Sequence, residues 1–207
     1  MKPRIYVDFD DVLCETAQAL MGLLERMFRK SVRFESIRTF DLSQSFGLGP
    51  EELASFMAAA HAPEIIEAIE PMEGAAEALS RWARSGVEVC IVTGRPPATE
   101  PASRRWLKVH EMPHSSLMFV DKYSRAFPLH AGPGAATLEQ LAGMEFSLAV
   151  DDAPMMLDFL AKRMAMPVVI FDRPWNADVK TGARVRRCRS WGEIASLPVA
   201  SLGHPRG

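Results

Sequence analysis

The feature that most constrains this chain is the run from residue 5 to residue 12, in which an apolar, largely β-branched segment ends in Asp8, Asp10 and Asp11. Such a segment predicts a buried strand that delivers its acids at the carboxyl end. Open α/β sheets bind their ligands at that edge. Because clustered carboxylates repel one another, we expect a hard metal ion among them, Mg²⁺ on oxygen ligands. The alternative is that Asp10 or Asp11 caps the following helix.

Composition narrows the class of protein. The 207 residues, 48% hydrophobic and 24% charged, can bury a full core and a modest second domain. A net charge of -2 predicts neither a nucleic-acid polymer nor a membrane surface as partner. Three distant cysteines suggest no disulfide framework or zinc site, and no run of about 18 apolar residues is present. These observations favour a cytoplasmic protein; the oligomeric state is not predicted.

The next part of the chain is predicted to be helical. Apolar residues recur at helical spacing over residues 17–28, whereas residues 31–50 look irregular. Pro50 and Pro63 each precede acids and begin further helices. We therefore expect a helical insertion over residues 14–70, separate from an α/β core formed by residues 1–13 and 71–207.

Alternating helices and strands follow the insertion. A helix is predicted over residues 75–84, ended by Gly86, and strands over residues 87–92, 116–120, 146–150, 168–171 and 185–188. The stretch around residues 131–136 is loop by composition. The strand predicted over residues 146–150 is followed by a helix for which Asp152 is a candidate N-cap. This alternation is typical of a parallel sheet.

Polar residues converge at the ends of four strands. In a parallel sheet these ends lie side by side along one edge. Each group has a role in phosphoryl transfer to a carboxylate nucleophile, with Mg²⁺ joining that carboxylate to the phosphate. The residues are Asp8 and Asp10, then Thr93, then Lys122, then Asp151 and Asp152.

The roles follow from the chemistry of each side chain. Asp8 can attack phosphorus and form an aspartyl-phosphate, and Asp10 can protonate the leaving oxygen and later deprotonate water. Thr93 and Lys122 can orient and neutralise the phosphoryl oxygens. One acid of the second doublet would complete the metal site.

With these motifs the sequence resembles the haloacid dehalogenase-like hydrolase superfamily. Within it, the chain is similar to the type C 5′(3′)-deoxyribonucleotidases and their bacterial nucleotidase-like relatives, a likeness that covers residues 5 to about 197. Five segments carry it: Asp8-x-Asp10-x-Val12, Val92-Thr93-Gly94-Arg95-Pro96, Trp106-Leu107-x-x-His110 followed by Lys122, Val150-Asp151-Asp152-Ala153-Pro154, and Arg173-Pro174-Trp175-Asn176.

The resemblance implies a three-layer, doubly wound α/β core with a small helical cap inserted between the first two motifs. It implies Mg²⁺ held by Asp8, the Asp10 carbonyl and Asp152, with Asp151 supporting them, and phosphate held by Thr93, Gly94 and Lys122. It also implies a small phosphomonoester as substrate, a deoxyribonucleoside monophosphate. Aromatic rings of the insertion are candidates to stack on the base, and Arg95 is a further candidate substrate ligand; the rings are Phe34, Phe40, Phe46 and Phe56.

Two departures and three alternatives accompany this interpretation. Asp11 stands where the family commonly has glycine, which restricts the backbone at a turn, and residues 123–150 are long for the subfamily. A phosphatase or phosphomutase for a sugar phosphate would share the core. A catalytically weak regulatory or binding member of the fold is a second alternative. A response-regulator receiver is a third, but the second acidic doublet follows Lys122, which is the wrong order for a receiver.

Overall fold

A six-stranded parallel sheet forms the centre of the computed structural model, which describes residues 2–39, 41–123 and 134–197. The strand order is β3-β2-β1-β4-β5-β6, and every neighbouring pair is parallel. All carboxyl ends therefore meet at one edge, and β1 lies in the middle. The strands are β1 Arg4–Asp8, β2 Glu88–Thr93, β3 Ser116–Phe119, β4 Leu148–Asp151, β5 Val168–Phe171 and β6 Val185–Cys188.

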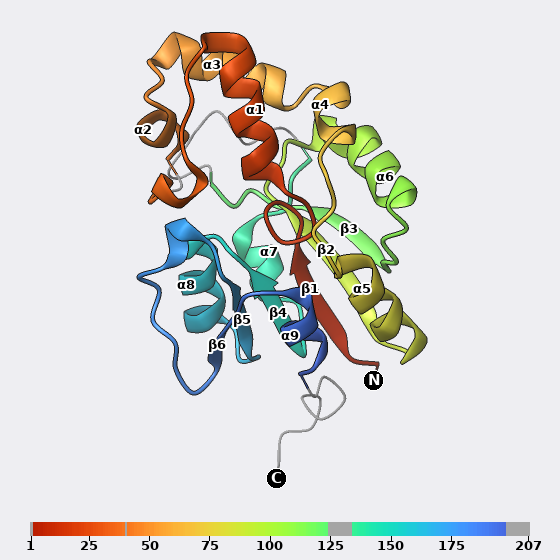
Figure 1. Cartoon of the computed structure of the whole chain (residues 1–207). Helices are drawn as coiled ribbons and strands as arrows, with labels where there is room; N and C mark the ends of the chain where they lie inside the picture. The colour runs from red at the N-terminus through yellow and green to blue at the C-terminus, as the bar shows by residue number, and fades with distance from the viewer. Residues whose placement is uncertain (1, 40, 124–133, 198–207) are drawn as a thin grey trace.

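Helices cover both faces of the sheet, which makes three layers (Figure 1). One face is covered by α5 (Ala75–Arg84), α6 (Glu100–Val109) and α9 (Trp191–Ala195), and the other by α7 (Leu138–Ala142) and α8 (Pro154–Arg163). Side chains alternate along β1, so Ile5 and Val7 join the first core whereas Tyr6 joins the second. The doubly wound α/β fold expected from the sequence is confirmed.

The helical insertion lies above the carboxyl edge of the sheet (Figure 1, red to orange). It contains α1 (Thr16–Phe28), a 3₁₀ turn η1 (Phe34–Ser36), α2 (Leu42–Phe46), α3 (Pro50–Ala60) and α4 (Pro63–Glu67). These elements share a core of their own that includes Leu24, Phe46 and Phe56. A helical insertion after β1 is thus confirmed, and its limits at residues 14 and 70 stay a prediction.

Two antiparallel connections join the insertion to the sheet. Leu13 accepts a backbone hydrogen bond from Met72 (2.8 Å), and Glu15 donates one to Glu70 (2.9 Å). Each connection also accepts a hydrogen bond from a buried indole of the core: Trp191 Nε1 donates to the Val12 carbonyl (2.7 Å) and Trp106 Nε1 to the Ile69 carbonyl (2.6 Å). The insertion is therefore anchored close to the acids that end β1.

Some local expectations are wrong. Asp152 does not cap α8, because Ala153 occupies the N-cap position and no side chain caps the helix there. Helix α2 lies in a segment expected to be irregular, where Asp41 accepts backbone hydrogen bonds from Ser43 and Gln44. The long segment 123–150 also contains α7, about which the sequence made no prediction and which begins with a capping box formed by Thr137 and Gln140. Residues 124–133 of that segment, with much of its expected loop, lie outside the described residues.

None of the helices in residues 2–39, 41–123 and 134–197 is long and apolar enough to span a membrane.

Candidate active site

Asp8 lies at the carboxyl end of the central strand with one of its two oxygens occupied. Its Oδ1 accepts hydrogen bonds from the Phe9 backbone N–H and from Lys122 Nζ, each at 2.7 Å. Oδ2 accepts none from the described residues. Burial raises the pKa of Asp8 well above its ordinary value, against the opposing charge of Lys122. A buried carboxylate with one oxygen available suits either a metal ligand or a nucleophile.

The two acids of the second doublet, Asp151 and Asp152, have different hydrogen-bond partners. Both oxygens of Asp151 are occupied: Oδ1 accepts from the Ala153 backbone N–H (2.9 Å), and Oδ2 from the Tyr6 hydroxyl (2.6 Å) and Lys122 Nζ (3.3 Å). Asp152 Oδ2 accepts a hydrogen bond from Trp175 Nε1 at 2.8 Å. Its Oδ1 accepts no hydrogen bond within the described part of the chain, so Asp152 is better placed than Asp151 to bind a cation directly.

The acids fit a hard divalent cation. Asp8, Asp151 and Asp152 are buried, and one carboxylate oxygen of each lies within 4.8 Å of the others. Burial, together with the charges of Asp11 and Asp151, raises the pKa of Asp152 against the opposing effects of the Trp175 hydrogen bond and the Arg173 charge. Oxygen ligands of this kind are those that Mg²⁺ prefers. Asp10 is not in this group, because its carboxylate pairs with Arg95.

Lys122 supplies the positive charge between two of these acids. Its side chain is fully buried, and its ammonium contacts Asp8 and Asp151. Burial disfavours the charged form, but the carboxylates of Asp151 and Asp8 outweigh this effect and raise the lysine's pKa. A permanently charged ammonium beside Asp8 is suited to holding a phosphoryl oxygen.

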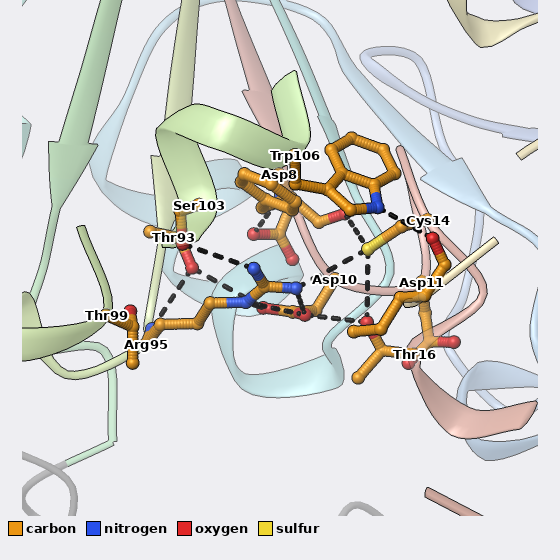
Figure 2. A network of polar contacts seen from close by, with 12 residues as sticks. Asp8, Asp10, Asp11, Cys14, Thr16, Thr93, Arg95, Thr99, Ser103 and Trp106 are labelled. Carbon is orange, nitrogen blue, oxygen red and sulfur yellow. Dashed lines mark hydrogen bonds and ion pairs between the residues drawn. The ribbon is translucent and has the colours of Figure 1, made fainter. Parts of the chain in front are cut away.

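Arg95 and Asp10 form an ion pair close to Asp8 (Figure 2). Arg95 donates to the Asp10 carboxylate from Nε (3.0 and 3.1 Å) and from Nη2 (2.7 Å), and Nη1 donates to Ser103 Oγ (3.2 Å). The guanidinium lies 4.1 Å from the centre of the Phe9 ring. Burial alone would raise the pKa of Asp10, but the charge and hydrogen bonds of Arg95 lower it.

Thr93 is the last residue of β2, and Gly94 follows it at the cavity. Thr93 Oγ1 accepts from the Arg95 backbone N–H (3.1 Å) and lies 3.4 Å from Asp10 Oδ2. A Cβ atom at Gly94 would lie 2.5 Å from Cε2 of Tyr123. Only glycine lets this loop approach the Tyr123 ring so closely.

Asp11 adopts a left-handed backbone conformation, with φ of 55°. This is the conformation that the usual glycine would adopt without strain, and aspartate is among the few other residues that tolerate it. Asp11 Oδ1 accepts a hydrogen bond from the Ala17 backbone N–H (2.9 Å) in the first turn of α1, although Glu15 and not Asp11 occupies the N-cap position of that helix. Burial raises the pKa of Asp11 to about 7.

A cavity of about 160 Å³ separates the acids from the insertion. Asp8, Asp10 and Arg95 line it on the core side, and its walls are mainly apolar. Most of the apolar wall residues come from the insertion, among them Leu20, Ile37, Leu42, Phe46, Leu53, Met57, Ala60 and Ile66. The predicted phosphate site and an apolar compartment therefore form one continuous space.

The aromatic residues expected to contact substrate have different positions. Phe46 lines the cavity and packs its edge against Phe56, which is fully buried. Phe34 does not line the cavity but lies edge-on to Trp175, with ring centres 5.7 Å apart. Phe40 lies outside the described residues. The roles of Phe34, Phe40, Phe46 and Arg95 in substrate binding stay predictions.

The sequence did not indicate a role in the site for three residues, Tyr6, Trp175 and Ser103. Tyr6 lies two residues before Asp8 on β1, so strand alternation alone places both on one face. Trp175 was noted only within a motif, and nothing local indicates that its indole reaches Asp152. Ser103 is a buried helix residue whose partner, Arg95, is set by tertiary structure.

The fold is similar to that of solved haloacid dehalogenase-like proteins. A solved haloacid dehalogenase-like protein of unknown function from Agrobacterium tumefaciens covers 99% of this chain and 100% of its own, with a TM-score of 0.63 and 15% identity. A subfamily IA hydrolase from Geobacter sulfurreducens covers 98% and 97%, with a TM-score of 0.56 and 18% identity. At these identities the likeness concerns the fold alone.

Residues 2–125 match the family described as 5′ nucleotidase, deoxy (pyrimidine), cytosolic type C protein. The chain belongs to this family. A candidate nucleotidase from Halalkalibacterium halodurans is 25% identical over 190 residues, which are 92% of this chain and 89% of that protein. The family resemblance seen in the sequence is confirmed.

Proposed function

We propose that the protein is an Mg²⁺-dependent phosphatase that hydrolyses nucleoside monophosphates, deoxyribonucleotides in particular, through an aspartyl-phosphate on Asp8. The observation that carries this proposal is the pair of available oxygens, Asp8 Oδ2 and Asp152 Oδ1, beside the Lys122 ammonium and below an apolar cavity. Family membership supports the nucleotide as substrate class. The three cysteines are free and buried, which is consistent with a reducing cytoplasm.

Each residue has a defined part in the proposed reaction. Asp8 attacks phosphorus with a carboxylate oxygen while the bond to the leaving oxygen breaks, and Asp10 gives that leaving oxygen a proton so that the nucleoside leaves as an alcohol. Water then attacks the aspartyl-phosphate and gives a proton to Asp10, which restores Asp8 and releases inorganic phosphate.

The surrounding groups hold the reacting atoms. Lys122 offsets negative charge on the phosphoryl oxygens, and Thr93 and the Gly94 backbone are proposed to bind the same group. Mg²⁺, held by Asp8, Asp152 and the Asp10 carbonyl, would supply the charge that lets a carboxylate approach a phosphate dianion. Asp151 supports the site through its bonds to Tyr6 and Lys122.

A phosphomonoester screen with and without Mg²⁺ tests the proposal. We expect nucleoside monophosphates to be hydrolysed, hydrolysis to stop in excess chelator, and Mg²⁺ to restore it. Full activity in chelator would contradict the assignment of Asp8 and Asp152. If sugar phosphates exceed every nucleotide in kcat/KM, the enzyme is a phosphatase for another small phosphomonoester.

A further inference from the structure

Asp152 is fixed by a single turn that follows β5. The 3₁₀ turn η3 (Pro174–Asn176) approaches Asp152 at two places. Trp175 Nε1 donates to the carboxylate oxygen Oδ2 at 2.8 Å, and Asn176 Nδ2 donates to the Asp152 backbone carbonyl at 2.8 Å. Asn176 and Asp152 are almost completely buried, and Trp175 is 7% exposed. Both the backbone and the side chain of Asp152 are thus held by neighbouring residues of one turn.

The turn itself is anchored to the edge of the sheet. Arg187 on β6 donates to the Asn176 side chain (2.7 Å) and to its backbone carbonyl (2.9 Å), and it also pairs with Asp172. Asn176 further accepts a hydrogen bond from the Arg173 backbone N–H (3.1 Å). These bonds leave η3 little freedom, so the direction of the Trp175 indole N–H is set by the core.

The Trp175 ring also belongs to the hydrophobic core of the helical insertion. Phe34 of η1 packs edge-on against it, with ring centres 5.7 Å apart. The same indole lines the cavity where the leaving group would lie. One side chain therefore contacts a proposed metal ligand, an element of the insertion and the substrate cavity.

We propose that Trp175 is a positioning residue of the metal site, which binds Asp152 Oδ2 so that Oδ1 faces the cation, and that Phe34 acts on the same site by fixing the Trp175 ring. This inference rests on the proposed function only in taking Asp152 as a direct ligand. Groups that orient a metal ligand typically change metal affinity by 10- to 100-fold when removed. Because the indole N–H contacts Asp152 Oδ2 and the ring packs against Phe34, a change in the insertion that moves Trp175 is expected to alter Mg²⁺ affinity.

The test measures Mg²⁺ binding directly, by calorimetric titration of the full chain after removal of metals, with no substrate present. Trp175→Phe keeps a ring against Phe34 but removes the N–H, and we expect the Kd for Mg²⁺ to rise about 10- to 100-fold. Phe34→Leu keeps an apolar side chain but loosens the packing around the Trp175 ring, and we expect a smaller rise in the Kd for Mg²⁺. Thermal unfolding in chelator shows that each variant is folded.

Tyr6→Phe is the matched control. It also removes one hydrogen bond from a buried acid, but Asp151 keeps its bonds to Ala153 and Lys122. We expect a smaller loss of Mg²⁺ affinity than for Trp175→Phe. An unchanged Kd in folded Trp175→Phe, or a greater loss in Tyr6→Phe, would overturn the assignment to Trp175. An unchanged Kd in Phe34→Leu would overturn the role of the insertion.

The outcome is separable from that of the proposed function. A wild-type protein that binds Mg²⁺ and loses affinity in Trp175→Phe, but hydrolyses no phosphomonoester, would overturn the proposed function and support the inference. If the wild-type protein hydrolyses nucleotides and Trp175→Phe binds Mg²⁺ as tightly as wild type, the inference is overturned and the proposed function is supported. Failure of the wild-type protein to bind Mg²⁺ overturns both.

Discussion

The Arg95 guanidinium is held edge-on by the Asp10 carboxylate, with its shortest contact, from Nη2 to Oδ1, at 2.7 Å. A third guanidinium nitrogen donates to Ser103, and Nη2 also contacts the Cys14 sulfur at 3.6 Å. Most of the donors of Arg95 are therefore directed at protein atoms. This arrangement favours a role for Arg95 in orienting Asp10, whereas the sequence alone suggested contact with substrate.

The first prediction concerns this ion pair. Arg95→Gln should lower kcat for a nucleoside monophosphate about 10- to 100-fold, because a displaced Asp10 transfers protons less efficiently, and should leave KM nearly unchanged. Arg95→Lys should not restore the rate, since lysine cannot form the paired contacts of the guanidinium. Steady-state kinetics on both variants measures the effect.

The matched control is Arg104→Gln. Arg104 also pairs with a carboxylate, Glu100, but both side chains are about half exposed on α6. Exposed pairs of this kind contribute at most about 1 kcal/mol, so activity should be unchanged. A raised KM with normal kcat in Arg95→Gln would instead support direct substrate binding by Arg95.

The second prediction separates the two aspartates that follow β1. Asp8→Asn should abolish turnover and yield no acid-stable, base-labile phosphoprotein, because an amide cannot form the acyl phosphate. Asp10→Asn keeps the nucleophile and should become phosphorylated slowly and release phosphate more slowly still, a loss of roughly 10²- to 10⁴-fold. Labelling of Asp8→Asn at the wild-type level would reverse the assignment.

Much of the framework could be predicted because its signals are local. Buried parallel strands read as continuous apolar runs, so residues 168–171 form β5 as predicted. Helix α5 covers residues 75–84 as predicted, and Gly86 adopts a φ of 78° beyond its end. The polar residues at the ends of predicted strands were sufficient to predict that Asp8, Lys122 and Asp151 lie close together, as they do in the structure.

The partners of individual side chains could not be predicted, because they depend on residues far apart in sequence. Arg95 and Asp10 are 85 positions apart, and Trp175 and Asp152 are 23 apart. The position of Asp11 was compatible with a metal ligand or with a helix cap, and the path of the chain between β1 and α1 directs its carboxylate to the Ala17 backbone N–H while Glu15 occupies the N-cap position. Likewise, the phenylalanines of the insertion were equivalent until the fold placed Phe46 at the cavity and Phe34 behind Trp175.

The third prediction concerns pH and stability without metal. Burial raises the pKa of Asp11 from an ordinary value of 3.8 to about 7. Between these values the folded protein holds a proton that the unfolded chain releases, so this group's contribution to stability is lost as pH rises from about 4 to about 7. Asp11→Asn keeps an acceptor for the Ala17 N–H and removes the charge. In chelator at pH 8 it should be more stable than wild type, by up to about 4 kcal/mol.

Urea unfolding at several pH values measures this difference, which should shrink toward zero near pH 4. Asp41→Asn provides a control of opposite sign. The Ser43 hydroxyl and backbone N–H groups of Ser43 and Gln44 lower the pKa of Asp41, so its contribution is present at neutral pH and lost on acidification. Equal stability of Asp11→Asn and wild type across this range would show that Asp11 keeps an ordinary pKa.

The fourth prediction concerns the leaving group. Phe46 is an aromatic residue of the insertion that lines the cavity, and stacking of a base on an aromatic ring contributes about 1 to 3 kcal/mol. Phe46→Leu keeps apolar volume against Phe56 and removes the ring. It should raise KM for nucleoside monophosphates about 5- to 150-fold, the range that this energy corresponds to. Hydrolysis of glycerol phosphate, which has no base, should change little.

Phe56→Leu is the control for this substitution, because Phe56 packs against Phe46 with ring centres 5.6 Å apart but does not line the cavity. A purely structural effect of losing a ring from the insertion would appear in both variants and with both substrates. A loss confined to Phe46→Leu and to nucleotides identifies Phe46 as the surface that the base contacts. If KM for nucleotides is the same in Phe46→Leu as in wild type, the base is bound elsewhere, and the apolar wall of the cavity selects substrates by shape alone.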